Sequence, residues 1–281
     1  MTGRQLIAAL RDSLAPHYGV REAEAIARLV AEERYGLGRS RLIADPEAEV
    51  DTPGFDQLLS ELVAMRPVQY VLGSADFCGL RIGVREGVLI PRPETAGLVE
   101  AAVSRLGTEA PLRLLDAGTG SGAIAIALAS RMPRAEVVAV DISDEALAIA
   151  RDNGRRLGMR VEWRRADILS PAFAVELGMF DAILSNPPYI PAGERETMHP
   201  NVTRYEPAGA LFVPDDDPLI FYRRLAEAGR AMLRPGGGLF FEIHERFADE
   251  VLQLLRAAGY VGTELLHDIF DKPRIVLCRK E

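Results

Sequence analysis

The fold of this chain is indicated most clearly by the stretch Leu114-Leu115-Asp116-Ala117-Gly118-Thr119-Gly120-Ser121-Gly122. Its apolar first half is typical of a buried strand, and glycines at alternate positions follow it. Glycine permits a positive φ and lets a ligand approach the backbone closely. An Ala- and Ile-rich run comes next. The stretch therefore predicts a strand, a glycine-rich turn and a helix that begins near residue 122.

Strands and helices alternate along the sequence that follows this turn, which is typical of a layered α/β fold. Strands are expected at 112–116, 137–141, 161–165, 180–185, 239–243, 261–266 and 274–279. Helices are expected near 94–106, 122–131, 144–157, 218–233 and 246–258. The last two strands have no helix between them. We therefore predict a Rossmann-like, seven-stranded and mostly parallel sheet with an antiparallel hairpin at one edge.

The glycine turn by itself leaves two classes of ligand open. Gly118, Gly120 and Ala123 satisfy the G-x-G-x-x-[GA] pattern of dinucleotide-binding proteins. Asp116, just before the turn, would repel a pyrophosphate and suits a cationic ligand instead. S-adenosylmethionine carries both an ammonium and a sulfonium group, so the acid favours this ligand over NAD.

Acids stand at the ends of three successive predicted strands, at Asp116, Asp141 and Asp167. Ligands of open α/β sheets bind outside the carboxyl ends of the strands. Asp141 is placed to accept both ribose hydroxyl groups, since a carboxylate can accept two hydrogen bonds side by side. Asp167 could accept a hydrogen bond from the adenine amino group. The alternative is that all three acids only cap strand ends or helices.

A second unusual stretch, Ser185-Asn186-Pro187-Pro188-Tyr189, follows the strand expected at 180–185. Two successive prolines lack backbone N–H groups and end any ladder or helix. The residue before a proline is extended, so a stiff turn is expected at the sheet edge. Its amide, free carbonyls and flat ring can hold a planar NH₂ group. An ordinary Pro-rich turn is the alternative.

The sequence predicts two further segments before residue 93. Residues 1–73 are expected to form a small helical bundle, with capping-box spacing between Thr2 and Gln5. This bundle is either a stabilising cap or a module that docks a partner. Residues 74–92 are expected to form a β-hairpin linker around Arg85-Glu86-Gly87, and residues 93–281 the α/β domain.

Composition excludes several classes of protein. The net charge of −8 over 281 residues argues against a basic nucleic-acid-binding surface. No apolar run approaches the ~18 residues that a membrane span needs. Only Cys78 and Cys278 occur, so no disulfide framework is indicated, and no Cys/His cluster has metal-ligand spacing. A cytoplasmic monomer without metal is expected.

Five stretches together resemble the HemK/PrmC family of S-adenosylmethionine-dependent methyltransferases, which modify the glutamine of the Gly-Gly-Gln motif in peptide chain release factors. They are Arg66–Gly73, Gly87–Thr95, Leu115–Gly122, Ser185–Ile190 and Tyr205–Pro207. The glycine turn is shared by many methyltransferases, and the Asn-Pro-Pro-Tyr turn by enzymes that methylate amino groups of bases. The Arg66–Gly73 and Gly87–Thr95 stretches and the helical N-terminal segment are the specific part. Ala96, Ile168 and His244 depart from the family pattern.

The resemblance implies methyl transfer from S-adenosyl-L-methionine, with S-adenosyl-L-homocysteine as product, to a release-factor glutamine. The residues expected to bind the cofactor are Asp116, Gly118, Thr119, Gly120, Ser121, Gly122, Asp141, Ile142, Asp167, Ile168 and Asn186. Those expected to bind the substrate are Arg92, Asn186, Pro187, Pro188 and Tyr189, of which Asn186, Pro187 and Tyr189 are the catalytic residues.

The expected chemistry needs no dedicated base. The Asn186 side-chain oxygen and the Pro187 carbonyl would accept the two N–H groups of the carboxamide, and Tyr189 would pack on its face. A tyrosine hydroxyl has an ordinary pKa of about 10, which makes Tyr189 a poor base. Two other functions stay open at this point: an amino-methyltransferase of adenine or guanine in DNA or rRNA, and a non-catalytic cofactor-binding protein.

Overall fold

A seven-stranded sheet forms the centre of the α/β part of the computed structural model, which describes residues 1–281 apart from the side chain of Glu176. Its strands are β3 (Arg113–Ala117), β4 (Glu136–Asp141), β5 (Glu162–Arg165), β6 (Phe180–Ser185), β9 (Leu233–Glu242), β10 (Tyr260–His267) and β11 (Pro273–Lys280). The strand order is β10-β11-β9-β6-β3-β4-β5, and β11 runs antiparallel to both of its neighbours. The predicted fold class is confirmed, including the antiparallel hairpin at one edge.

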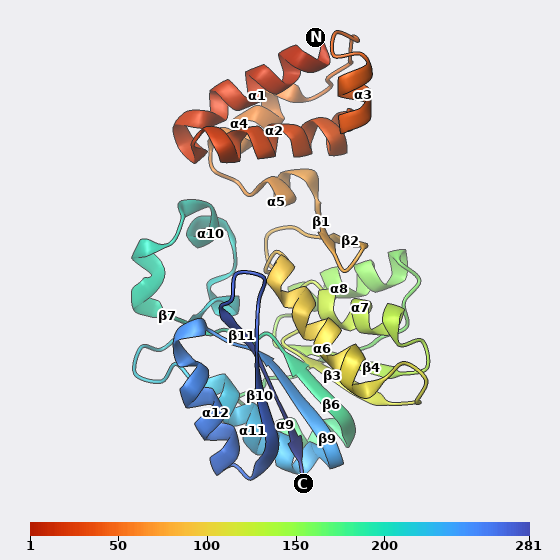
Figure 1. Ribbon diagram of the computed structural model, residues 1–281, viewed down its shortest axis with the longest axis vertical. Coiled ribbons are helices and arrows are strands. Elements are labelled where there is room, and N and C mark those ends of the chain that lie inside the picture. Colours follow the sequence, from red (N-terminus) through yellow and green to blue (C-terminus); the bar gives the residue numbers. More distant parts are fainter. The chain divides into compact units, whose positions relative to one another are not determined.

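Helices cover both faces of this sheet (Figure 1). On one face lie α6 (Ala96–Leu106), α7 (Ala123–Arg131) and α8 (Asp144–Arg156), and on the other lie α9 (Phe173–Leu177), α11 (Ile220–Met232) and α12 (Ala248–Ala257). Both faces of the central strands are therefore buried, and such strands read as nearly continuous apolar runs. Ala- and Ile-rich α7 is buried from Ala123 to Leu128, which explains why its sequence shows no polar face.

The described chain divides into two units. One contains Ala75–Met198 with Glu206–Glu281, and the other contains Met1–Ser74 with His199–Tyr205. The elements of the second unit are α1 (Gly3–Tyr18), α2 (Val20–Tyr35), α3 (Arg39–Ala44), α4 (Phe55–Val63), α5 (Val68–Leu72) and α10 (Pro200–Tyr205). Among the described helices of the whole chain, none combines the length and the apolar character needed to cross a membrane.

The helical unit has a core of its own. Leu6, Leu10 and Leu14 are fully buried against α2 and α4. The capping box predicted at the start of α1 is confirmed, since Thr2 accepts from the Gln5 N–H and the Gln5 side chain accepts from the Thr2 N–H. The segment 199–205 packs on this unit, where the Tyr205 hydroxyl donates to the Ala64 carbonyl at 2.7 Å.

The hairpin predicted over 74–92 is wrong in its extent. The two strands are β1 (Ser74–Phe77) and β2 (Leu80–Gly83), and Cys78 and Gly79 form the turn between them with φ of 50° and 75°. Positive φ at both turn positions is what a tight two-residue hairpin needs. The strand stops at Gly83 because the Asn153 side chain of α8 takes up both the N–H and the carbonyl of Gly83, at 2.8 Å each. Residues 84–92 form no strand.

The long loop predicted over 190–216 contains short elements. The pair β7 (Ile190–Pro191) and β8 (Phe212–Val213) forms a small parallel sheet. The 3₁₀ helices of this loop are η2 (Ala192–Thr197) and η3 (Ala208–Ala210), and η1 (Pro93–Thr95) and η4 (Glu245–Phe247) lie elsewhere in the chain. The strand β9 begins at Leu233, earlier than the predicted 239, and the other predicted strands and helices of the sheet layers lie within about two residues of their observed positions.

Candidate active site

The carboxyl ends of four parallel strands bring the predicted residues of the α/β domain to one edge of the sheet. Asp116 and Asp141 lie at the ends of β3 and β4, Asp167 just after β5, and Asn186 just after β6. The strand β3 pairs with β4 on one side and β6 on the other, so the connections diverge at this point. Such a switch point is where open α/β sheets bind ligands.

The glycine turn is held by backbone hydrogen bonds. The N–H groups of Gly118 and Thr119 both donate to the Val140 carbonyl at 2.9 Å, and the Gly120 N–H donates to Asp141 Oδ2 at 2.8 Å. Gly122 has a φ of 83°, and a Cβ there would lie 2.9 Å from the Trp163 ring. At Gly120 the space where a Cβ would stand is open within 4 Å, so a ligand can reach the backbone at that position.

Asp116 is fully buried beneath this turn. Its Oδ2 accepts from the Thr119 hydroxyl at 2.6 Å and from the Ala125 N–H at 3.1 Å. Its Oδ1 is buried and has no hydrogen-bond partner in the described part of the chain. Burial raises the pKa of Asp116 to about 7, against the hydrogen bonds from Thr119 and Ala125. One oxygen therefore braces the turn, and the other is a buried acceptor without a partner.

Asp141 and Asp167 also make the strand-end contacts that the alternative interpretation expects. Asp141 Oδ1 accepts from the Ser143 N–H at 2.9 Å, and Asp167 Oδ1 accepts from the Leu169 N–H at 2.8 Å. A carboxylate oxygen has more than one acceptor position, so these contacts leave room for hydroxyl or amino groups. Asp167 is exposed and Asp141 is half-buried.

The two isoleucines predicted beside the cofactor have different environments. Ile142 is 58% exposed, whereas Ile168 is 7% exposed and belongs to the core of the sheet layer. A Cβ built on Gly118 would lie 3.8 Å from Ile168 Cδ1, so Ile168 packs beside the glycine turn. Ile142 is therefore the larger free apolar surface at this edge.

The Asn-Pro-Pro-Tyr turn is anchored by side chains from distant parts of the chain. The Ser185 hydroxyl donates to the Ala117 carbonyl at 2.6 Å, which ties the end of β6 to β3. Asn186 Nδ2 donates to Thr95 Oγ1 at 3.2 Å. The Tyr189 hydroxyl donates to Glu242 Oε1 at 3.1 Å. Pro187 is buried and Pro188 half-buried, so the turn is fixed along its whole length.

Glu242 is a functional candidate that the sequence reasoning missed. It is the last residue of β9, its exposed fraction is 1%, and its Oε2 has no hydrogen-bond partner among the described residues. Burial raises the pKa of Glu242, and the hydroxyls of Thr95 and Tyr189 oppose that rise. Burial also raises the pKa of Tyr189 far above its usual value. Its position could have been recognised in the sequence, because Glu242 is an acid at the end of a fourth predicted strand, as Asp116, Asp141 and Asp167 are at the ends of three others.

Arg92, predicted to bind the substrate, forms an ion pair with Glu206. Its Nη2 lies 2.5 Å from Glu206 Oε1, and Glu206 Oε2 accepts from the Ile90 N–H at 3.0 Å. The Glu206 side chain is 1% exposed and that of Arg92 is 33% exposed. The Gly87–Thr95 and Tyr205–Pro207 stretches, far apart in sequence, are thus joined through a buried carboxylate.

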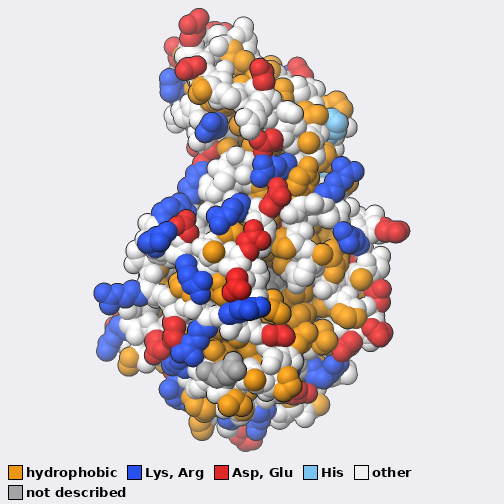
Figure 2. Space-filling model, turned by 180° about the vertical axis from the view of Figure 1, so that it is seen from behind, with side chains coloured by type: hydrophobic (Ala, Val, Ile, Leu, Met, Phe, Trp, Pro, Cys, Tyr) orange, Lys and Arg blue, Asp and Glu red, His pale blue; other side chains and the backbone are white. Residues whose placement is uncertain are grey.

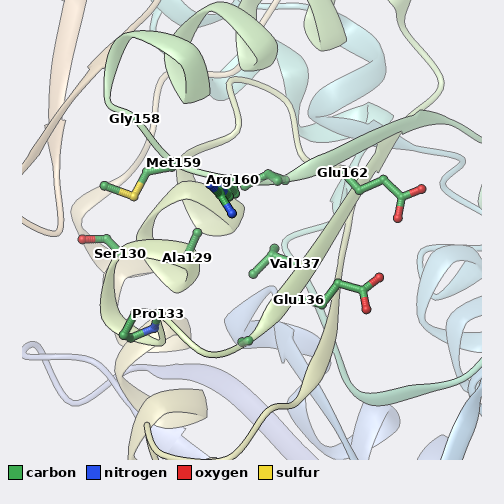
Figure 3. Close-up of a pocket in the computed structure, with 11 residues that line it drawn as sticks. Ala129, Ser130, Pro133, Glu136, Val137, Gly158, Met159, Arg160 and Glu162 are labelled. Carbon is green, nitrogen blue, oxygen red and sulfur yellow. The ribbon is translucent and has the colours of Figure 1, made fainter.

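A hollow of about 800 Å³ lies at another place in the fold (Figure 3). Its lining includes Glu136 and Glu162, the first residues of β4 and β5, together with Ala129, Pro133 and Met159. The amino ends of parallel strands lie at the opposite edge of the sheet from their carboxyl ends. The hollow is therefore separate from the edge that carries Asp116 and Asn186, and it contains none of the predicted site residues.

Comparison with known proteins agrees with this fold. A family model described as a methyltransferase domain matches residues 114–205, and one described as the PrmC N-terminal domain matches residues 5–73. A solved 16S rRNA methyltransferase of T. thermophilus, in complex with AdoMet and guanosine, has a TM-score of 0.54 at 22% identity and covers 74% of this chain and 50% of its own. A methyltransferase from Pyrococcus furiosus has a TM-score of 0.52 at 18% identity, covering 72% and 89%.

These matches define the chain as a methyltransferase with a Rossmann-like catalytic domain. Its sequence is 40% identical to a release factor glutamine methyltransferase of Bacteroides thetaiotaomicron, over 98% of this chain and 99% of the relative. A second, from Streptococcus pneumoniae, is 41% identical over 79% of this chain and 78% of the relative. The chain belongs to the family of release factor glutamine methyltransferases, as the resemblance in its motifs implied.

Proposed function

We propose that this protein transfers a methyl group from S-adenosyl-L-methionine to the side-chain nitrogen, N5, of the glutamine in the Gly-Gly-Gln motif of peptide chain release factors. The observation that carries the proposal is the tethered amide of Asn186. Its Nδ2 is bonded to Thr95, and its Oδ1 has no hydrogen-bond partner among the described residues. An oriented acceptor therefore stands at the carboxyl edge of the sheet, next to the glycine turn.

The residues at this edge fit the cofactor. The carboxyl group of Asp116, buried beneath the glycine turn with Oδ1 unpartnered, would attract a cationic group bound over the turn, and the open space over Gly120 admits a ligand to the backbone. Asp141 would hold the ribose hydroxyls, Asp167 the adenine amino group, and exposed Ile142 an apolar face of the base. S-adenosylmethionine, when bound, supplies a methyl group on a positively charged sulfur, and the neutral thioether S-adenosylhomocysteine is left.

The chain's own residues would orient the accepting amide. A carboxamide nitrogen is a weak nucleophile because its lone pair is delocalised into the carbonyl group. Asn186 Oδ1 and the Pro187 carbonyl would each accept one N–H of the glutamine side chain. This contact fixes the nitrogen toward the methyl group and can supply up to ~7–11 kcal/mol of the barrier reduction. The nitrogen gains one methyl group and releases one proton to water.

Charge supports a protein substrate over a nucleic acid. The chain has a net charge of −8, and on the face in Figure 2 acidic and basic side chains are interspersed. Binding to a phosphate backbone depends on clustered Lys and Arg. We propose that the helical residues 1–73 dock the release factor, because the family-specific N-terminal match covers them. The site of action would be the cytoplasm, with the enzyme as a monomer.

The test is methyl transfer from radiolabelled cofactor to separate acceptors. The expected result is label in purified release factor, at a rate insensitive to moderate salt, and none in a release factor whose Gly-Gly-Gln glutamine is replaced by glutamate. DNA and rRNA serve as competing acceptors in parallel reactions. Label in either nucleic acid, with none in the release factor, would overturn the proposal. A protein that binds the cofactor but labels no acceptor would be a binding protein.

A further inference from the structure

We infer that the tip of the β10–β11 hairpin, residues 268–272, is a contact surface for the release factor, where Ile269 and Phe270 bind apolar side chains beside the Gly-Gly-Gln loop. This inference rests on the proposed function, because it names a part of the enzyme that would hold the protein around the methylated glutamine. The contact lies in the α/β unit itself, outside the helical residues 1–73.

The topology of the sheet places this tip at the edge that carries the candidate active site. The strand β11 runs antiparallel to both β9 and β10, so β10 runs in the same direction as β9 and ends at the carboxyl edge. In Figure 1 the connection from β10 to β11 lies at the end of the sheet away from the C-terminus, which follows β11. The hairpin tip and Asn186 therefore share one edge.

The strand order divides this edge into two sides. Asp116, Asp141 and Asp167 stand at the ends of β3, β4 and β5, whereas β9, β11 and β10 lie on the other side of β6. A cofactor bound over the three acids leaves the second side to the protein that carries the glutamine. Strands are ~4.8 Å apart, so β11 lies about 10 Å from β6. A few extended residues beside the glutamine, at ~3.3–3.6 Å each, span this distance.

The tip presents two large apolar side chains to solvent. Ile269 is 92% exposed and its neighbour Phe270 is 69% exposed. Of the described phenylalanines, Phe270 alone is exposed. Single apolar residues on a surface are ordinary, but an adjacent pair at the end of a hairpin beside a site for a protein substrate fits a binding contact. Burial of such a pair by a partner removes apolar area from water, which favours association.

The tip is held in one conformation by the residues around it. Asp268 Oδ1 accepts from the Phe270 N–H at 2.9 Å and from the Lys272 N–H at 3.1 Å. Asp268 Oδ2 accepts from Arg274 Nη2 at 3.2 Å. The Lys272 ammonium forms an ion pair with Glu245 at 2.9 Å. A surface that is already ordered loses little conformational freedom when a partner binds, so more of the apolar contact contributes to affinity.

The base of the hairpin is joined to the acceptor half of the site. Ile275 lies opposite Glu242 in the pairing of β11 with β9, and the Ile243 N–H donates to the Arg274 carbonyl at 2.9 Å. Glu242 Oε1 in turn accepts the Tyr189 hydroxyl at 3.1 Å. The fold thus fixes the hairpin relative to the Asn-Pro-Pro-Tyr turn. A release factor held at the tip is therefore held in a defined position relative to that turn.

The first test is steady-state kinetics of the double variant Ile269→Ser, Phe270→Ser with intact release factor as the substrate. The KM for release factor should rise by about 10- to 100-fold, as for loss of a dominant apolar contact in an interface. The value of kcat should stay within about twofold of the wild type, because the lost contact binds ground state and transition state equally. The cofactor Kd and the Tm should be nearly unchanged, since both side chains lie in solvent.

Val175→Ser is the matched control. Val175 is 85% exposed and lies on α9, which leads into the amino end of β6, at the opposite edge of the sheet. Its KM should equal that of the wild type. An unchanged KM in the double variant, or the same rise in Val175→Ser, would overturn the inference. Failure of the wild type to methylate release factor in this assay would instead overturn the proposed function.

A second readout locates the partner directly. Phe270 is replaced by the photoreactive p-benzoylphenylalanine, and the full-length enzyme is illuminated with release factor and S-adenosylhomocysteine. Mass spectrometry should place the crosslink on a release-factor residue close to the Gly-Gly-Gln loop. A crosslink between two copies of the enzyme, with none to the release factor, would assign the tip to self-association and overturn the inference. So would the absence of any crosslink at concentrations of release factor that saturate the wild type.

Discussion

The two halves of the candidate site are built in different ways. The half that would hold the cofactor is centred on one continuous glycine turn, in which Gly118, Thr119 and Gly120 are fixed by hydrogen bonds to Val140, Asp116 and Asp141, and its other acids stand at the ends of neighbouring strands. The half that would hold the glutamine depends on side chains from three distant segments, at Thr95, Asn186 and Glu242. The glycine turn and the strand-end acids are therefore visible as local patterns in the sequence, whereas the contacts of the acceptor half arise only in the folded sheet.

The largest effect is expected at Asn186. Asn186→Ala removes the oriented acceptor, and kcat should fall by about 10²–10³-fold or more, as for loss of one preorganised hydrogen-bonding group at a reacting centre. Calorimetry should show nearly unchanged affinity for S-adenosylmethionine, because the amide of Asn186 is bonded to Thr95 and no hydrogen bond joins it to the glycine turn in the described part of the chain. Equal loss of transfer and of cofactor affinity would place Asn186 in the cofactor half of the site.

Substitution of Asp141 should have the opposite effect, weakening cofactor binding while leaving kcat nearly unchanged. Asp141→Ala removes an acceptor for the ribose hydroxyls and a bond to the Gly120 N–H, so the cofactor Kd should rise by about 10- to 100-fold, in line with hydrogen bonds to charged groups. At saturating cofactor, kcat should stay within a few-fold of the wild type. Asp144→Ala is the control, since the Asp144 side chain is 73% exposed and lies on the next helix. A large loss of kcat at saturating cofactor would contradict the assignment of Asp141 to cofactor binding.

A smaller effect is expected at Tyr189. Tyr189→Phe removes the bond to Glu242 while keeping the ring, and kcat should fall by about 3- to 10-fold, the worth of one hydrogen bond. Burial raises the pKa of Tyr189, so ionisation of this residue should contribute no rise of kcat with pH below 10. A rise in the wild type that disappears in Tyr189→Phe would identify a base. Tyr260→Phe, which removes a buried hydroxyl bonded to Ala226, is the control.

The smallest effect concerns stability at Asp116. Its pKa of about 7 in the folded protein lies above the ordinary 3.8, so between these values the folded chain holds a proton that the unfolded chain has lost. Stability contributed by Asp116 is therefore lost as the pH rises from about 4 to 7. The Tm of the cofactor-free Asp116→Asn variant, relative to wild type, should increase by a few °C over this window. A difference in Tm that does not depend on pH would contradict the raised pKa.

The sequence predicted the cofactor half in detail because backbone geometry and strand ends are local signals. The turn from Gly118 to Gly122 and the strand ends at Asp141 and Asp167 are where the motifs indicated. Asp116 was correctly placed at the end of a strand, but its burial depends on the packing of α7 over it. Ile168 was expected to face the ligand and lies in the core, because a single residue after a strand gives no sign of which face it occupies.

The acceptor half could be predicted only in part. The Asn186–Tyr189 turn is evident from its prolines, but Thr95 and Glu242 lie 91 and 56 residues away in sequence, and only the pairing of β6 with β9 brings Glu242 beside the turn. The ion pair of Arg92 with Glu206 likewise joins residues that are far apart in the sequence and that no local pattern links. The hairpin at 74–83 was extended too far because its end is set by Asn153, a contact with α8 that no local pattern encodes.

The most direct measurement is tandem mass spectrometry of a release factor after incubation with the enzyme and S-adenosylmethionine. We predict a mass gain of one methyl group on the Gly-Gly-Gln peptide, located by fragmentation on the side-chain nitrogen of the glutamine and absent with Asn186→Ala. A methyl group on another residue, or an unmodified glutamine after complete cofactor turnover, would contradict it.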